Sequence, residues 1–230
     1  MTRALAAFPN AQFVQGYGMT ELSPSATILP AWYHTPEGQA AGKMRSAGRA
    51  TYATEVRIVD ENDAEVARGT VGEVCVRGPG VMKGYWNKPE LTQTTLRGGW
   101  MHTGDAAYMD ADGFIFVVDR LKDMIVSGGE NVYSAEVENA IARHPAVAAC
   151  AVIGIPSDEW GETVHAAIVL KAGQSATAEE IVAHCKALIA GYKCPRSLAF
   201  ADTLPLSAAG KILKSELREP FWRGRKRNVS

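Results

Sequence analysis

The sequence predicts a mixed fold in two parts: a β-rich region of α/β character, followed by a small α+β domain. In the first half, residues 56–59 and 72–77 alternate apolar and polar side chains, which is the period of half-buried strands. In the second half, apolar residues within 134–145 and 178–189 recur three and four positions apart, as on one face of a helix. The order of these segments places strands first and an α+β unit second.

In the first half, a further strand is expected at residues 114–118. It follows a turn at residues 110–113, whose glycine can adopt a positive φ, and so completes a hairpin. Charged residues at 119–123 interrupt this apolar strand, and we place the domain boundary there. The predicted domains are residues 1–121 and residues 122–230.

In the second half, Ser134 is a good helix N-cap, and Glu136 and Glu138 suit the positive end of the helix dipole. Two buried strands are expected next, at residues 147–155 and 163–170, because both segments are rich in Val, Ile and Ala. The last predicted helix, at residues 178–189, has one apolar face, formed by Ile181, Cys185 and Leu188.

Composition restricts the class of protein. A chain of 230 residues with 47% hydrophobic content can form one sizeable core or two smaller ones, and its formal net charge of -1 gives no footprint for nucleic acid. No apolar run approaches the length of a membrane span. We expect a cytoplasmic protein with small-molecule partners, in which the four cysteines are reduced thiols and the basic end at 222–227 is solvated.

Four ordered motifs carry the candidate chemistry. They are residues 15–21 (QGYGMTE), 102–105 (HTGD), 119–131 (DRLKDMIVSGGEN) and 205–211 (PLSAAGK). The first offers an aromatic face between small glycines, the second a carboxylate that matches a sugar diol, and the last a long cation on a glycine turn. Together they suit a nucleotide joined to an acyl group.

In sequence and order these motifs resemble the carboxy-terminal half of the acyl-adenylate-forming (AMP-binding) enzymes, and within them the fatty-acyl-CoA synthetases. The resemblance covers nearly the whole chain. It implies the end of a large adenylating domain, with a β-rich subdomain, followed by a small mobile carboxy-terminal domain. It also implies a reaction in which a carboxylic acid, expected to be a fatty acid, reacts with ATP and Mg²⁺ to give acyl-AMP, from which CoA then displaces AMP.

The resemblance assigns nucleotide binding to six positions in the first motifs. These are Gly16, Tyr17, Gly18, Thr20, Asp105 and Arg120. Tyr17 would stack on adenine, Thr20 would contact the α-phosphate, and Asp105 and Arg120 would bind ribose. Glu21 would hold Mg²⁺, for which hard oxygen ligands are suited. From the residues alone, a turn with a core tyrosine and an ordinary Asp105–Arg120 ion pair remain open as alternatives.

The resemblance makes Lys211 the adenylation lysine, with Thr20 and Glu21 as the other catalytic residues, and makes Lys122 the hinge on which the small domain pivots. A mobile cation at Lys211 would stabilise the charge that develops at the α-phosphate. Lys214, three residues further on, is expected to be a solvated helix position.

A second group of residues is assigned to CoA by the same resemblance. The group comprises Ser127, Gly128, Gly129, Glu130, Trp160, Tyr192, Lys193 and Arg196. The glycines would allow close approach of a pantetheine arm, and the aromatic and basic residues would contact the CoA nucleotide. Cys194 departs from a basic residue seen there in some members, and ordinary packing remains an alternative for Trp160 and Tyr192.

The Ser/Thr/Gly-rich phosphate loop that precedes the first motif in this family has no counterpart in the sequence. We therefore expect a fragment that does not form acyl adenylate alone, and whose exposed remnant of the large domain could self-associate. Two other functions stay open: an adenylation domain that loads a carrier protein, and a non-catalytic module that binds nucleotide or CoA.

Overall fold

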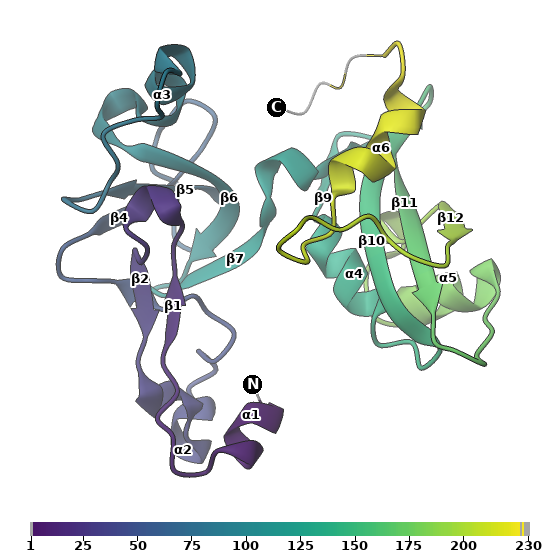
Figure 1. The fold of residues 1–230 in the computed structure, drawn as a ribbon, viewed down its shortest axis with the longest axis horizontal. Coiled ribbons are helices and arrows are strands. Elements are labelled where there is room, and N and C mark those ends of the chain that lie inside the picture. Colours follow the sequence, from purple (N-terminus) through teal and green to yellow (C-terminus); the bar gives the residue numbers. More distant parts are fainter. Residues whose placement is uncertain (1, 226, 228–230) are drawn as a thin grey trace. The chain divides into compact units, whose positions relative to one another are not determined.

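The computed structural model describes residues 2–225 and residue 227, and the chain divides into two compact units, Met1–Val117 and Val118–Ser230 (Figure 1). Both units mix helices and strands, which confirms the predicted mixed fold. Among the described residues, no helix has the length and apolar character needed to cross a membrane.

Two sheets form the first unit. The smaller sheet contains, in spatial order, β1 (Gln15–Tyr17), β2 (Thr27–Leu29) and β3 (Arg49–Ala50). The larger sheet contains β4 (Glu55–Val59), β5 (Gly72–Arg77), β6 (Met101–Met109) and β7 (Ile115–Arg120). The strands predicted at residues 56–59 and 72–77 are therefore confirmed, and they pair with each other in antiparallel register.

Short helical segments connect these strands. The α-helices are α1 (Thr2–Ala7), α2 (Pro36–Gln39) and α3 (Pro89–Thr95), and the 3-10 turns are η1 (Thr20–Leu22), η2 (Ala31–His34) and η3 (Arg97–Gly99). Inward side chains of the larger sheet build the core of this unit, with Leu22 of η1 packed against them. Its buried members include Ile58, Val74, Val76, Met101 and Ile115.

The second unit is an α+β structure around one sheet. Its strands are β8 (Ile125–Ser127), β9 (Glu130–Val132), β10 (Val147–Ser157), β11 (Gly161–Leu170) and β12 (Ser197–Phe200). Its helical segments are η4 (Leu121–Asp123), α4 (Ser134–Ile141), α5 (Ala178–Lys186), η5 (Gly191–Lys193) and α6 (Lys214–Trp222). Four of the strands lie in the spatial order β10-β11-β8-β9. The fifth strand, β12, also pairs with β11, in parallel orientation.

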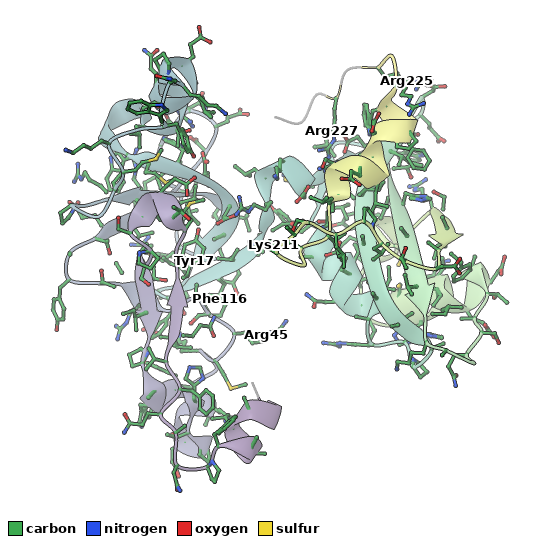
Figure 2. The ribbon with its side chains drawn as sticks, in the orientation of Figure 1. Tyr17, Arg45, Phe116, Lys211, Arg225 and Arg227 are labelled. Atoms are coloured by element: carbon green, nitrogen blue, oxygen red, sulfur yellow. The ribbon has the colours of Figure 1, made fainter. Side chains whose placement is uncertain are left out.

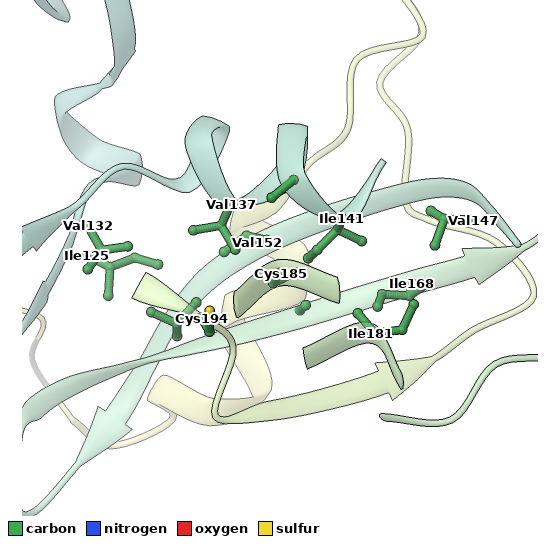
Figure 3. Close-up of a cluster of buried hydrophobic side chains, with 13 residues drawn as sticks. Ile125, Val132, Val137, Ile141, Val147, Val152, Ile168, Ile181, Cys185 and Cys194 are labelled. Carbon is green, nitrogen blue, oxygen red and sulfur yellow. The ribbon is translucent and has the colours of Figure 1, made fainter. Parts of the chain in front are cut away.

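The core of the second unit lies between this sheet and helices α4 and α5 (Figure 3). Val137 and Ile141 of α4 and Ile181 and Cys185 of α5 are fully buried there. Thr177 caps α5 with a capping box, because its hydroxyl accepts from the N–H of Glu180 while the carboxylate of Glu180 accepts from the N–H of Thr177. Each unit thus has its own hydrophobic core.

Three expectations about local structure are wrong. The strand predicted to stop at residue 118 continues to Arg120, because the carboxylate of Asp119 has partners of its own and the charge does not break the strand. Ser134 is the first residue of α4 rather than its N-cap, and its hydroxyl donates to Asp119. Leu188 lies beyond α5 and is 42% exposed, since a turn after the helix packs Ile189 on the core instead.

Candidate nucleotide and thiol site residues

The first motif meets the second within the first unit. Tyr17 ends β1, and its hydroxyl donates a hydrogen bond to Oδ2 of Asp105 at 2.6 Å across 88 positions of sequence. Gly16 lies in the middle of β1, where a Cβ would lie 3.3 Å from the hydroxyl of Ser25. At Gly18 a Cβ would collide with the backbone carbonyl of Pro24, so only glycine lets the chain double back after Tyr17. Figure 2 shows Tyr17 on β1.

Glu21 is held by a tyrosine that the sequence analysis did not single out. Oε1 of Glu21 accepts a hydrogen bond from the hydroxyl of Tyr85 at 2.8 Å, and the backbone carbonyl of Glu21 accepts from the N–H of Met82 at 2.8 Å. Burial, and then the hydrogen bond to Glu21, raise the pKa of Tyr85, so this phenol remains a donor at neutral pH. Thr20 is exposed at the start of η1.

Asp105 stands in a bulge of β6. Glu73 pairs with Ala106 and Cys75 pairs with His102, so the three residues from Thr103 to Asp105 stand opposite the single residue Val74. The hydroxyl of Thr103 donates to the carbonyl of Val74 at 2.8 Å and accepts from the N–H of Asp105 at 3.1 Å. The side chain of Thr103 thereby replaces part of the interrupted ladder and keeps Asp105 in place.

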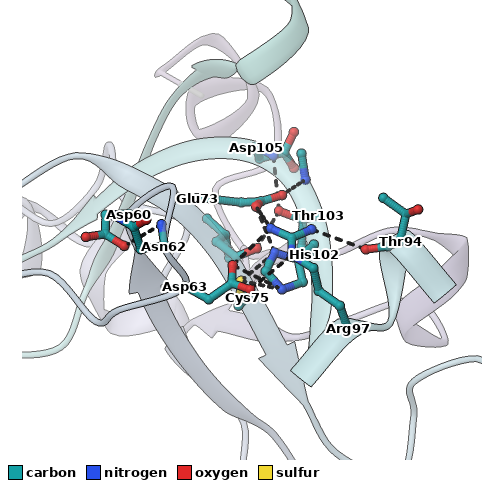
Figure 4. A network of polar contacts seen from close by, with 12 residues as sticks. Asp60, Asn62, Asp63, Glu73, Cys75, Thr94, Arg97, His102, Thr103 and Asp105 are labelled. Carbon is teal, nitrogen blue, oxygen red and sulfur yellow. Dashed lines mark hydrogen bonds and ion pairs between the residues drawn. The ribbon is translucent and has the colours of Figure 1, made fainter. Parts of the chain in front are cut away.

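A buried polar network lies beside this bulge (Figure 4). His102 Nδ1 lies 2.8 Å from Oε2 of Glu73 and 3.2 Å from Sγ of Cys75, and these three residues offer metal-ligand atoms within 4.8 Å of one another. The guanidinium of Arg97 lies 3.4 Å from Glu73 and 3.0 Å from Asp63, so the positive charge of Arg97 compensates both carboxylates. Burial, and then the charge of Glu73, raise the pKa of Cys75 to about 12, which keeps its thiol protonated. We interpret the cluster as an ion-pair network.

In the second unit, a second network surrounds Lys214. Its Nζ lies 2.7 Å from Oε1 of Glu138 and donates to the hydroxyl of Ser134 at 2.7 Å, and that hydroxyl donates to Oδ2 of Asp119 at 2.7 Å. The expectation of a solvated Lys214 is therefore wrong, because its side chain is only 15% exposed, forms an ion pair with Glu138 and is linked to Asp119 through the hydroxyl of Ser134. Burial raises the pKa of Glu138, and Lys214 opposes that rise.

The hinge candidate Lys122 lies in η4 with an exposed side chain, while its backbone is anchored within the second unit. The carbonyl of Lys122 accepts hydrogen bonds from Arg218, at 3.1 Å, and from Arg227. Arg218 also forms an ion pair with Asp123 at 2.9 Å. Arg120, which precedes this segment, is exposed at the end of β7, and its N–H donates to Asp119.

The basic end of the chain is not simply solvated. Arg227 forms an ion pair with Glu162 at 2.6 Å, and the two side chains are only 16% and 6% exposed. Arg225, by contrast, contacts an exposed Asp158 at 3.2 Å, while Lys226 lies outside the described residues. The expectation of a solvated tail is therefore wrong for Arg227.

The glycine pair of the third motif forms a tight hairpin turn. Ser127 pairs with Glu130 across the turn, and Gly128 and Gly129 have φ values of +63° and +85°. Positive φ at both central residues is the geometry of a type I′ turn, which glycine adopts without strain. The N–H of Gly128 donates to the carbonyl of Trp160 at 2.9 Å, and a Cβ on Gly128 would lie 2.6 Å from the indole ring.

The remaining thiol-site candidates fall into two groups. The guanidinium of Arg196 lies 4.3 Å from the ring centroid of Trp160, so Arg196, Trp160 and the glycine turn form one cluster. Lys193 instead pairs with Glu136 of α4 at 2.8 Å, beside an exposed Tyr192. Burial, the largest single influence, lowers the pKa of Lys193, but the hydrogen bond that Lys193 donates to Glu136 and the negative charge of Glu136 together raise it above the ordinary value. Cys194 is buried.

Lys211 lies on a closed turn that precedes α6 (Figure 2). The N–H of Ser207 donates to the carbonyl of Lys211 at 2.8 Å, and the N–H of Gly210 donates back to the carbonyl of Ser207 at 2.8 Å. Gly210 has a φ of +74°, and apart from its chain neighbours none of the described atoms lies within 4 Å of a Cβ placed there, as in a hairpin loop that ends in a left-handed glycine. Lys211 is exposed, and within the described residues its Nζ forms no hydrogen bond or ion pair.

Sequence reasoning missed three residues that support these sites: Glu73, Tyr85 and Lys214. Nothing in the sequence distinguishes Glu73 from a solvent-facing strand residue, because its contact with the bulge depends on a register shift. Tyr85 and Lys214 act through contacts 64 and 80 positions away, which only the fold reveals.

Comparison with known proteins agrees with this arrangement. The model of the AMP-binding enzyme family matches residues 1–86, and the model of the AMP-binding enzyme C-terminal domain matches residues 136–211. The chain is 48% identical to the feruloyl-CoA synthase of Amycolatopsis sp, over 91% of this chain and 41% of that protein. It is 41% identical to the fatty acid–[acyl-carrier-protein] ligase ScoC of Streptomyces coeruleorubidus, over 95% of this chain and 42% of that protein.

Among solved structures, the chain is similar to the o-succinylbenzoate CoA synthetase MenE of Bacillus subtilis in complex with its acyl-adenylate intermediate. The TM-score is 0.82 at 35% identity, over 94% of this chain and 43% of the other. The chain belongs to the acyl-adenylate-forming superfamily of AMP-binding enzymes. It spans about two fifths of the length of the two curated relatives named above.

Proposed function

We propose that this chain is the carboxy-terminal portion of an AMP-forming acid–thiol ligase, an acyl-CoA synthetase. In the first step a carboxylate oxygen of the acid attacks the α-phosphorus of ATP, and pyrophosphate leaves. In the second, the sulfur of CoA attacks the acyl carbonyl carbon, AMP leaves, and the thiol proton passes to solvent. The observation that carries this proposal is the hydrogen bond that joins Tyr17 to a buried Asp105 in a member of this superfamily.

Tyr17 and Asp105 of the first unit would bind the adenosine part of the nucleotide. The hydrogen bond to Asp105 fixes the orientation of the Tyr17 ring, which gives adenine a rigid face on which to stack. A carboxylate has enough lone pairs to accept hydrogen bonds from ribose hydroxyls in addition to that from Tyr17. We therefore assign adenine to Tyr17 and ribose to Asp105, with Arg120 as a second ribose contact.

Glu21 would hold Mg²⁺ and Thr20 the α-phosphate. Tyr85 donates to one oxygen of Glu21 and so orients the carboxylate, whose other oxygen is a hard ligand of the kind that Mg²⁺ prefers. The metal would neutralise negative charge on the phosphates. Thr20, exposed at the start of η1, would donate a hydrogen bond from its hydroxyl to the α-phosphate.

The second unit would supply the adenylation lysine and the path of the thiol. An exposed Lys211 on a closed turn is available to place a positive charge near an α-phosphate. The turn at Gly128 and Gly129 has no side chain at its tip, so a slender pantetheine arm could approach its backbone. Trp160 could stack on the base of CoA, and Arg196 could contact its phosphates. We assign the hinge to Lys122, whose own unit holds its carbonyl through two arginines.

The acid and the thiol acceptor are two further assignments. The printed names of the relatives include an aromatic acid, in feruloyl-CoA synthase, and a fatty acid, in ScoC. We propose a carboxylic acid of one of these two classes, with CoA as acceptor because of the Arg196–Trp160 cluster. A carrier protein is the second candidate acceptor, favoured by the similarity to ScoC.

A titration of the chain with AMP tests the nucleotide assignment. Wild type should bind AMP, and Asp105→Asn should bind it at least about tenfold more weakly, because a charge-assisted pair of ribose hydrogen bonds is weakened. Equal affinity of the two proteins would contradict the assignment. In a parallel assay with ATP, Mg²⁺, CoA and a panel of aromatic and fatty acids, we expect no sustained pyrophosphate release from the chain alone.

A further inference from the structure

We propose that Glu73 is a positioning residue for nucleotide recognition: its carboxylate holds the β6 bulge in the shape that presents Asp105 to ribose. The inference rests on the proposed nucleotide-binding function of Asp105. It concerns a residue that lies outside all four sequence motifs, on the neighbouring strand β5.

The bulge leaves backbone donors without ladder partners, and Glu73 supplies an acceptor for one of them. Opposite Val74 stand three residues of β6 where a regular ladder would have one. The N–H of Gly104, at the centre of the bulge, donates to Oε1 of Glu73 at 2.9 Å. Gly104 has a φ of +71°, so the bulge also depends on a left-handed residue at this point.

The second oxygen of Glu73 holds the other end of the bulge. Nδ1 of His102 lies 2.8 Å from Oε2 of Glu73, so this nitrogen donates and the imidazole is fixed by the same carboxylate. The side chains of Glu73 and His102 are 14% and 3% exposed, and Arg97 lies 3.4 Å from Oε2 as the compensating charge. One carboxylate therefore contacts the residues on both sides of Thr103.

The next residue in the chain is Asp105, whose own carboxylate accepts from Tyr17. Without Glu73, the N–H of Gly104 would lose its acceptor in a partly buried position, and the bulge could relax toward other arrangements. Asp105 would then no longer be held at a constant distance from Tyr17. The expected consequence is a loss of ribose recognition, with the stacking face of Tyr17 retained.

The experiment compares AMP with 2′,3′-dideoxy-AMP, which lacks the diol, on four forms of the whole chain: wild type, Glu73→Ala, Glu73→Gln and Glu55→Gln. Glu55 is the matched control, an exposed carboxylate on the adjacent strand β4 that pairs with Arg77. Wild type, Glu55→Gln and Glu73→Gln should favour AMP by at least about tenfold, since glutamine retains an acceptor for Gly104. Glu73→Ala should favour AMP by less than about threefold.

Amide hydrogen exchange at Gly104 gives an independent readout. Its exchange should be at least about tenfold faster in Glu73→Ala than in wild type, with no change in Glu55→Gln. If Glu73→Ala does not fold, Glu73→Asp takes its place, because a side chain shorter by one methylene cannot contact both Gly104 and His102. Unchanged exchange at Gly104, or undiminished preference for AMP, would overturn the proposal. Failure of wild type to bind AMP would contradict the nucleotide function, while the exchange rates would still decide whether Glu73 holds the bulge.

Discussion

At the scale of single residues, three buried acidic side chains of the described part of the chain each have a hydrogen-bonding partner. Asp105, Asp119 and Glu162 are all at most 9% exposed, and each accepts at least one hydrogen bond from a side chain. Because an unpaired buried charge is costly, these partners decide which acidic side chains can be kept inside. The Tyr17–Asp105 contact is the pair with the most direct bearing on the proposed function.

The first prediction concerns Tyr17. Tyr17→Phe should keep the stacking ring but lower the unfolding free energy of the first unit by about 1.5 kcal/mol, since it removes a hydrogen bond to a charged group. Urea denaturation would measure this, with Tyr52→Phe at a fully exposed position as the control. AMP affinity should change less than in Tyr17→Ala. Identical stability of the two Phe variants would contradict the account.

A second prediction follows from the partial burial of Lys214. Lys214→Met should destabilise the second unit by about 3 kcal/mol, because it leaves the carboxylate of Glu138 without its compensating charge. The double variant Lys214→Met, Glu138→Gln should recover much of that loss, and Lys186→Met, at an exposed position of α5, should have little effect. Chemical denaturation of all three variants provides the measurement. If the double variant were no more stable than Lys214→Met, the charge explanation would fail.

The third prediction is a pH dependence from His165, whose Nδ1 lies 2.8 Å from the hydroxyl of Ser197. Burial lowers the pKa of His165 below its ordinary value of 6.5, so the unfolded chain takes up a proton before the folded one does. Stability should therefore fall as the pH decreases below 6.5, down to the folded pKa. His165→Gln should show a flatter stability profile between about pH 5 and pH 7. An unchanged slope would rule out His165 as its source.

The sequence alone predicts some of the candidate site residues but not the contacts that hold them. Tyr17, Asp105 and Lys211 are predicted from the order of the four motifs and their resemblance to a family, and their roles remain predictions. Lys214 differs from the expected solvated position because its partners Ser134 and Glu138 belong to α4, with Ser134 80 positions away, and both α4 and α6 pack on β10. The sequence contains no local sign of such a contact.

At the scale of elements, the alternation of apolar and polar residues predicts the strands β4 and β5, whereas the charged residues at 119–123 wrongly predict the end of β7. The alternating residues of β4 and β5 were assigned correctly, since one face of each strand packs on the core. The charge of Asp119 predicts that the strand ends before it. β7 nevertheless includes Asp119, because the hydroxyl of Ser134 donates a hydrogen bond to its carboxylate. Ser134 is not the N-cap of α4, because the extended residue Tyr133 occupies that position, and Asp119 accepts from the N–H of Ala135 in the first turn.

The glycine turn between β8 and β9 gives an element-scale prediction. Gly128→Ala should destabilise the second unit more than Gly129→Ala, because a Cβ at Gly128 would lie 2.6 Å from Trp160, whereas none of the described atoms lies within 4 Å of a Cβ at Gly129. Gly129→Asn should be milder still, since asparagine tolerates a left-handed conformation. Thermal unfolding of the three variants would rank them. Equal losses at both positions would show that backbone strain alone governs the turn.

At the scale of the whole molecule, the chain consists of two units that each possess a hydrophobic core and a separate set of candidate site residues. The first carries the adenine candidate Tyr17 and the ribose candidate Asp105, and the second carries the ribose candidate Arg120, the adenylation lysine and the thiol-loop candidates. The first unit exposes apolar side chains, among them Val14, Trp32 and Trp86. We propose that the chain self-associates through these side chains.

The most direct test of the proposed function joins this chain to the upstream region of the 48%-identical feruloyl-CoA synthase, which supplies the part of the relative that this chain does not span. The two half-reactions are then measured separately, as pyrophosphate release and as thioester formation from supplied acyl-AMP. Lys211→Ala should lower adenylation by about 10²-fold or more and leave the second half-reaction largely intact, as expected when one electrostatic contact to the transition state is removed. Equal loss in both half-reactions, or none in either, would contradict the assignment of Lys211 as the adenylation lysine.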